Sequence, residues 1–209
     1  DVEGAQPPDV TKAIWDTMQQ IRDDLPAGYR IDIGGSVEQS GKADQSIQKL
    51  QPLMLALMLI FIMLQMRSFS GTFMVFFTAP LGLIGAAVAL FIFDQPFGFT
   101  ALLGLIGLGG ILMRNTMILT QQVQDNLEEG LAAGKAIIEA TVSRARPLIL
   151  TALAAIFAFI PLTFDLFWGP LAYVLIGGVM MGTFITLLFV PAMYALWFKV
   201  EAPKYDDAL

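Results

Sequence analysis

QKLQPLMLALMLIFIMLQM, residues 48–66, decides the class of fold to which this chain belongs. Its one charged residue is Lys49, near the start, and Leu, Met and Ile dominate the rest of the stretch. A helix needs about 20 mostly apolar residues to cross the hydrocarbon core of a bilayer. The length and composition of this stretch therefore predict a membrane-spanning helix.

The composition of the whole chain is typical of an integral membrane protein. Hydrophobic residues make up 56% of the 209 residues and charged residues 14%, whereas a soluble domain has about 25% charged residues. The net charge of −6 suggests no nucleic-acid partner. Cysteine and histidine do not occur in the sequence, which excludes disulfides, thiolate chemistry and histidine as metal ligand. We expect no enzymatic activity, no cofactor and no metal site.

Four more apolar stretches of similar length follow the first one. Short loops at Asp94 and Asp165 join the second to the third and the fourth to the fifth, so each pair is predicted to form a tight hairpin. A polar segment at about 124–142 joins the third stretch to the fourth and is predicted to form a short helix on the membrane surface. The predicted fold class is an all-α membrane protein, a bundle of five transmembrane helices within residues 44–198, with spans at 48–66, 72–93, 98–121, 146–164 and 170–198.

The distribution of Lys and Arg orients this predicted bundle. Cytoplasmic connections carry an excess of positive charge, and the hairpins at Asp94 and Asp165 contain no Lys or Arg. Five crossings then place residues 1–43 outside and the tail, residues 199–209, in the cytoplasm. The positive charges on the predicted cytoplasmic side are Arg67, Lys135, Arg144, Arg146, Lys199 and Lys204.

Residues 1–43 are polar and predict one helix and one strand. Ile14, Met18, Ile21 and Leu25 recur at helical spacing, and residues 29–33 alternate between apolar and charged side chains, the pattern of a half-buried strand. One helix and one strand cannot close a core, and a lone strand needs partners. We therefore interpret this segment as a small α/β remnant, the end of a larger domain.

Arg114 is the principal candidate for function because it stands inside the third predicted span. Insertion scales assign a free-energy cost of about +2.5 to +3.5 kcal/mol to an arginine at the centre of a membrane span. Two interpretations are open: the side chain extends to the headgroups, or it faces protein and has a partner there. Gly107 and Gly110 point within about 40° of Arg114 on a helix and form a stripe that favours close helix packing. Asn115, about 100° away, is a second polar candidate.

The fourth span adds Arg144 and Thr151, which are two helical turns apart and share a face. Arg144 can also be read as an anchor at the membrane surface, as can Arg146, and Thr151 can simply bond its own backbone. The hypothesis is a proton-relay path formed by Arg114, Asn115, Arg144 and Thr151. All 18 acidic residues lie in polar segments or loops, so an anionic partner of Arg114 must come from protein outside this sequence.

Two weaker patterns concern packing. Gly178 and Gly182 form a GxxxG motif in the fifth span, which usually marks helix packing. Eleven methionines, some one turn apart, could indicate transfer of a soft metal. Packing is the favoured interpretation of these methionines, because the flexible thioether side chain fills irregular gaps.

Several of these stretches together resemble the C-terminal membrane part of resistance–nodulation–division (RND) efflux pumps, closest to their hydrophobe/amphiphile, or multidrug, branch. The resemblance covers the chain from about residue 27 onwards. The motifs, in order along the chain, are GGSVEQSG, TAPLGLIGA, GLGGILMRNTMILTQQV, AIIEATVSRARPLILTALAAIFAFIPL and FVPAMYALWF.

The resemblance implies a proton/drug antiporter of the bacterial inner membrane, usually a trimer, with twelve helices per protomer in two repeated halves. This chain would supply the end of the second periplasmic porter domain and the last five of the twelve helices. A periplasmic adaptor, an outer-membrane channel and membrane lipids would be its partners. The missing N-terminal half would supply the acidic relay residues.

The family also implies roles for individual residues. A basic residue, usually lysine, stands at the position of Arg114 and faces a pair of aspartates on a helix of the first half. The functional arginine and threonine of the next span correspond to Arg144 and Thr151. The metal-efflux branch would have an acidic residue near Arg114, and this stretch has none.

The resulting hypothesis is proton-coupled efflux of drugs or amphiphilic compounds, with Arg114 as the fixed positive member of the relay. One alternative is a membrane subunit that does not transport but scaffolds or docks a partner, its charges serving as anchors. Another is a relative within the same superfamily that exports proteins or lipids.

Overall fold

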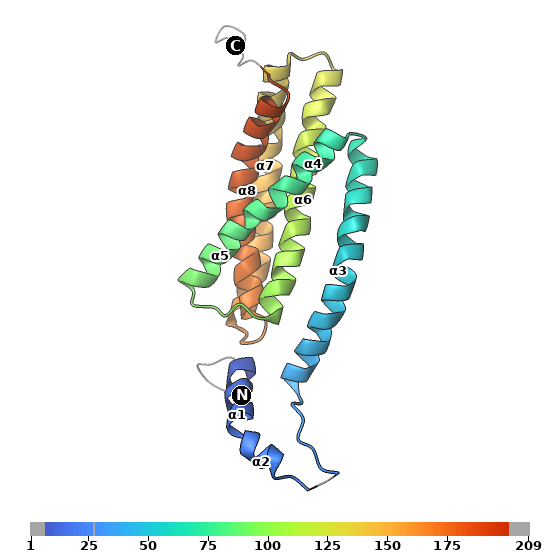
Figure 1. Ribbon diagram of the computed structural model, residues 1–209. Coiled ribbons are helices and arrows are strands. Elements are labelled where there is room, and N and C mark those ends of the chain that lie inside the picture. The colour runs from blue at the N-terminus through green and yellow to red at the C-terminus, as the bar shows by residue number, and fades with distance from the viewer. Residues whose placement is uncertain (1–6, 27, 201–209) are drawn as a thin grey trace. The chain divides into compact units, whose positions relative to one another are not determined.

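The computed structural model describes residues 7–26 and 28–200, and all regular secondary structure in these residues is helical (Figure 1). The remaining parts of the predicted segments 1–43 and 199–209 lie outside the described residues. The elements are α1 (Pro7–Thr17), α2 (Gln19–Asp23), α3 (Ser36–Met66), α4 (Phe69–Thr78), the 3-10 turn η1 (Ala79–Leu81), α5 (Gly82–Ile92), α6 (Phe99–Glu128), α7 (Ala133–Phe159), the 3-10 turn η2 (Ile160–Phe164) and α8 (Gly169–Trp197).

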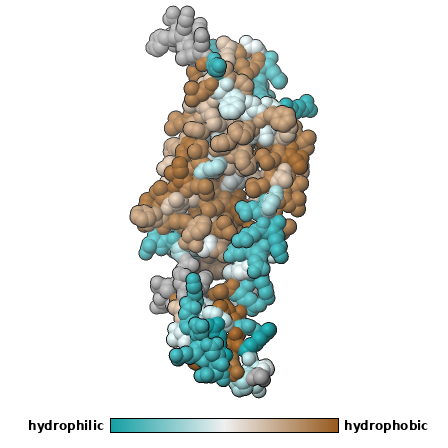
Figure 2. Space-filling model, in the orientation of Figure 1, coloured by the Kyte–Doolittle hydropathy of each residue, from teal (hydrophilic) through white to brown (hydrophobic). Residues whose placement is uncertain are grey.

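The five predicted spans are confirmed as helical segments. Within the described residues, five segments are long and apolar enough to cross a membrane. Apolar side chains also lie on the outside of the helices, where a bilayer core would cover them: Phe91 is 87% exposed and Leu188 is 75% exposed. Figure 2 shows this apolar surface on the face drawn. The segments are Ser40–Met66, Phe69–Ile92, Phe99–Glu128, Ala133–Phe164 and Gly169–Trp197.

The separate surface helix predicted at about 124–142 does not form. Instead α6 continues to Glu128, and α7 begins at Ala133. Gly130 ends α6 with φ +89°; its N–H donates to the carbonyl of Leu127, and the Leu131 N–H donates to that of Asn126. This pair of bonds is a Schellman cap, for which glycine is the preferred residue. The polar segment is therefore the two ends of long helices joined by a short turn.

The second predicted span is interrupted at Pro80. This residue has no backbone N–H, and its ring clashes with the turn before it, so α4 gives way to the 3-10 turn η1 before α5 begins. The interruption lets the two halves pack on different neighbours. α4 contacts mainly α6, whereas α5 has its most extensive contact with α8.

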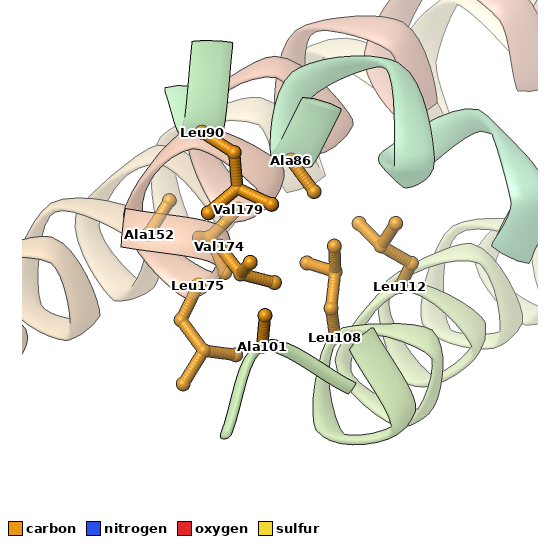
Figure 3. Close-up of a cluster of buried hydrophobic side chains, with 9 residues drawn as sticks. All are labelled: Ala86, Leu90, Ala101, Leu108, Leu112, Ala152, Val174, Leu175 and Val179. Atoms are coloured by element: carbon orange, nitrogen blue, oxygen red, sulfur yellow. The ribbon is translucent and has the colours of Figure 1, made fainter. Parts of the chain in front are cut away.

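The core of the membrane part forms around α8, which contacts α5, α6 and α7. Figure 3 shows the central cluster: Leu108 and Leu112 of α6 point towards the side chains of α5 and α8. A second cluster joins α4, α6, α7 and α8, and a third joins the end of α3 to α4 and α6. In the third cluster Met66 and Met113 are buried together with Ile62 and Val75. These two methionines therefore pack in the core.

Glycine makes the contact between α5 and α8 possible. A Cβ atom on Gly85 would lie 2.4 Å from the carbonyl oxygen of Gly177, and one on Gly177 would lie 2.7 Å from the carbonyl oxygen of Gly85. Both distances are far below van der Waals contact, so the two backbones touch directly. Close backbone approach of this kind is how helices associate inside a membrane, where burial of apolar surface gives no advantage over lipid.

The unit Asp1–Ala56, taken by itself, has few buried side chains among its described residues. The predicted amphipathic helix is split at Met18 into α1 and α2, and its apolar residues Ile14 and Ile21 are 54% and 57% exposed. The guanidinium of Arg22 lies 3.9 Å from the centre of the Trp15 ring and donates to the Trp15 carbonyl oxygen at 3.1 Å. These local contacts order the turn between α1 and α2 but do not make a core.

The strand predicted at residues 29–33 is not formed among the described residues, where this segment has no regular secondary structure. A strand is stabilised by hydrogen bonds to a neighbouring strand, and the described residues offer none. The α/β character of the N-terminal segment remains a prediction about the chain within a larger domain.

We expect a soluble peptide of residues 1–43 not to fold on its own. The exposed Ile14 and Ile21 show that little apolar surface is buried, too little to offset the entropy of ordering about 40 residues. Circular dichroism of the peptide during heating should change gradually. A cooperative, sigmoidal thermal transition would contradict this prediction.

Candidate functional site

Arg114 lies on α6 with its side chain exposed. The predicted glycine stripe beside it is open: a Cβ on Gly110 would have no atom within 4 Å, and one on Gly107 would meet only Leu175 at 4.0 Å. The two ion pairs among the described residues, Arg30–Asp32 and Lys42–Glu38, both precede the last four helices. Arg114 is thus a fixed positive charge on a helix face to which the described chain brings no carboxylate.

The other side of α6 at this level is buried and polar. Asn115 is 5% exposed and Thr116 is fully buried. The hydroxyl groups of Thr116 and Thr78 lie 2.9 Å apart and link α6 to the end of α4, while Thr120 donates to the carbonyl of Thr116 at 2.8 Å. We did not anticipate this hydroxyl group pair from the sequence, although Thr116 and Thr120 at one-turn spacing were a visible signal.

Arg144 of α7 is held by hydrogen bonds to α6. Its Nε donates to Oε1 of Gln122 at 2.9 Å, and its Nη2 donates to the same oxygen. Gln122 stands eight residues after Arg114 on α6, about 12 Å along the helix axis. The structure therefore brings Arg144 to α6 about two turns from Arg114 and does not bring the two cations into contact.

Thr151 donates its hydroxyl hydrogen to the carbonyl of Leu148 within α7 at 2.9 Å, the local bond that threonine often makes in membrane helices. Its side chain is exposed. Because α6 and α7 are antiparallel and Arg144 meets Gln122, the rise of about 1.5 Å per residue places Thr151 near the level of Asn115 and Arg114. Arg146 is exposed near the same end of α7 as Arg144.

The glycines differ in what they contact. A Cβ on Gly178 would lie 2.2 Å from Leu108 Cδ2, and one on Gly182 would lie 2.4 Å from Leu112 Cδ2, so these two glycines of α8 accommodate leucines of α6. Gly107 and Gly110 accommodate no comparable neighbour in the described chain. The close approach of Gly85 to Gly177 was not recognised in the sequence.

Comparison with known proteins places this arrangement among membrane transporters. The sequence profile of the AcrB/AcrD/AcrF family matches residues 2–198. The cobalt-zinc-cadmium resistance protein CzcA of Cupriavidus metallidurans is 31% identical over 87% of this chain and 18% of its own length. The swarming motility protein SwrC of Bacillus subtilis is 33% identical over 98% of this chain and 20% of its own length.

A multidrug resistance protein, MdtC of Proteus mirabilis, is 38% identical over 56% of this chain and 12% of its own length. A crystal structure of a heavy metal efflux pump has the same fold over 95% of this chain and 20% of the pump, with a TM-score of 0.72 and 22% identity. The chain thus spans about a fifth, or less, of the length of these relatives.

Proposed function

This chain belongs to the AcrB/AcrD/AcrF family of RND transporters, and from that premise we propose that it is the C-terminal part of a proton-coupled exporter of drugs or amphiphilic compounds in the bacterial inner membrane. It would supply the last five of twelve helices, with residues 1–43 as the end of a periplasmic α/β domain. The whole protein would form a trimer and work with a periplasmic adaptor and an outer-membrane channel.

The observation that carries the proposal is the positive charge of Arg114, which has no carboxylate partner among the described residues. A guanidinium is always charged, and keeping it inside a span costs enough that a partner is expected. The face around Arg114 and Gly110 is free of neighbours in the described chain. The family's repeated halves offer an occupant for this face, a helix of the first half that carries aspartates.

In this proposal the aspartates hold the proton and Arg114 senses their charge. Ionised aspartates pair with Arg114, and protonated ones release it, so the two helix faces separate and pack differently. Asn115, which is buried on the other side of α6, would belong to the polar layer behind Arg114. Thr151 would lie near the level of Arg114, and Arg144 would continue the polar path towards the cytoplasm. Repeated protonation and release would drive the porter domain that moves the substrate.

Export of divalent metal ions is a second candidate, favoured by the name of the relative CzcA, a cobalt-zinc-cadmium resistance protein. This chain has no His or Cys, and none of its acidic residues lies inside a predicted span. The ligands of a transported metal ion would therefore have to come from the rest of the longer protein. We rank export of amphiphilic compounds first because the motifs resemble the multidrug branch most closely and the stretch around Arg114 lacks the acidic residue expected of the metal-efflux branch. A scaffold subunit and a protein- or lipid-exporting relative are kept as further alternatives.

The test is substrate-dependent proton flux by the full-length protein in liposomes with an imposed pH gradient. We expect ethidium, a lipophilic cation, to accelerate proton movement measured with an internal pH dye. If only Zn²⁺ or Co²⁺ accelerates proton movement, the substrates are metal ions and not amphiphilic compounds. No acceleration by either class would contradict a proton-coupled exporter of both kinds and favour the scaffold alternative.

We also predict the orientation of the helices from the asymmetry of Lys and Arg. With single cysteines introduced at Asp165 and at Lys135 of the full-length protein, a membrane-impermeant maleimide added from outside should label the first and not the second. The hairpin at Asp165 contains no Lys or Arg, whereas Lys135 lies near Arg144 and Arg146 at the other end of α7. The reverse pattern would overturn the orientation and place the segment 1–43 in the cytoplasm.

A further inference from the structure

Three side chains between α6 and α7 form one continuous series of hydrogen bonds. Arg144 donates from Nε and Nη2 to Oε1 of Gln122. Gln122 donates from Nε2 to Oδ1 of Asn126 at 2.9 Å. Asn126, which is 6% exposed, donates from Nδ2 to the backbone carbonyl oxygen of Ala136 on α7 at 3.0 Å. This series of hydrogen bonds therefore starts and ends on α7 and passes through two side chains of α6.

Every hydrogen bond in this series is donated in the direction from Arg144 towards Ala136. Each side-chain amide therefore has only one orientation that satisfies both of its neighbours. Gln122 must present oxygen to the guanidinium and nitrogen to Asn126, and Asn126 must present nitrogen to the carbonyl of Ala136. Amide side chains supply one acceptor and one donor group each. Neither leucine nor glutamate could replace Gln122 and keep both links unchanged.

The partners of Arg144 in this series are neutral. A carboxylate would pair with the guanidinium and largely cancel its charge, whereas an amide oxygen fixes the group and leaves the charge in place. The ion pairs of the described residues do not involve Arg144. Arg144 is thus a positioned cation that still attracts an anion.

We propose that Gln122 and Asn126 are positioning residues that hold Arg144 as a fixed, uncompensated positive charge at the α6–α7 end of the relay. The inference rests on the proposed function, because the position of Arg144 matters only if that charge acts in transport. Without Gln122 the long side chain of Arg144 is free to turn to the headgroups. The charge would remain in the protein but no longer stay at one place beside α6.

The first measurement does not depend on transport. An arginine-selective dicarbonyl reagent, phenylglyoxal, is applied to the purified full-length protein, and the modification rate of Arg144 is followed by mass spectrometry. Gln122→Ala should raise this rate about tenfold, the ratio expected for loss of hydrogen bonds to a charged group. Gln122→Glu keeps an acceptor for the guanidinium and should restore most of the protection.

Gln121 provides the matched control, since its amide bonds only Asp125 in its own helix at 3.0 Å. Gln121→Ala should leave the modification rate of Arg144 unchanged. Asn126→Ala removes the second link and should raise the rate by less than Gln122→Ala does. A rate for Arg144 in Gln122→Ala equal to that of the unmodified sequence would overturn the proposal.

Transport in liposomes is then compared for Arg144→Ala, Gln122→Ala and Gln121→Ala. We expect the maximal rate to fall strongly in the first, severalfold in the second and not in the third, with little change in KM. If Arg144→Ala transports normally, the role of Arg144 in the proposed function is wrong. If Arg144→Ala is inactive while Gln122→Ala is fully active, the proposed function stands and the positioning inference alone is wrong.

Discussion

Arg114→Ala should abolish export by the full-length protein while expression and membrane insertion are retained. The side chain is exposed, so its truncation should disturb the packing of this part of the fold little. Its expected effect is electrostatic. In the proposed mechanism, carboxylates of the partner helix would lose their compensating charge without the cation, and burial would then favour their neutral, protonated form. They would hold protons throughout the cycle, and transport would stop.

Arg114→Lys should retain part of the activity, because the charge survives while the planar group with its paired donors is lost. The control is Arg146→Ala, which removes an exposed arginine near the end of α7 that is predicted to face the cytoplasm and should have only a mild effect. Efflux by cells that express equal amounts of each variant is the measurement. An Arg114→Ala variant as active as the unmodified protein would leave Arg114 as a membrane-surface anchor.

Gly85→Ala should have the largest effect on stability. The added methyl group would lie 2.4 Å from the carbonyl oxygen of Gly177 and 2.5 Å from Cβ of Met181. One of these atoms belongs to the backbone of α8, so a change of side-chain rotamer cannot relieve the clash. The helices α5 and α8 must move apart, and overpacking of this kind typically costs about 1–3 kcal/mol. Gly177→Ala, with Cβ of Ala89 at 2.3 Å, should behave alike.

Gly109→Ala is the control for this prediction. A Cβ at this position of α6 would meet no atom within 4 Å in the described chain, and alanine favours the helix by up to about 1 kcal/mol. Its thermal midpoint in detergent should therefore be unchanged or slightly raised, whereas that of Gly85→Ala should fall clearly. Equal midpoints for the two variants would show that α5 and α8 do not touch where the structure places them.

The sequence alone determined the number of spans and the class of the protein. The cost of placing a segment in lipid is a sum over its own residues, so a long apolar run reveals a span wherever the rest of the chain lies. Arg114 could be identified in the same way, because the free-energy cost of a charge inside an apolar run can be recognised from that run alone. Motif order then suggested the family.

Tertiary structure alone decided which residues touch. Gln122 becomes the partner of Arg144 only because the cap at Gly130 folds α7 back along α6, and no periodicity within either helix records that pairing. Gly85 and Gly177 lie far apart in the sequence, and each looks like an ordinary glycine until α5 crosses α8. Conversely, Gly107 and Gly110 have the right spacing but face open space. A packing contact depends on two surfaces and the angle at which they meet, and the sequence of one helix carries only one of those surfaces.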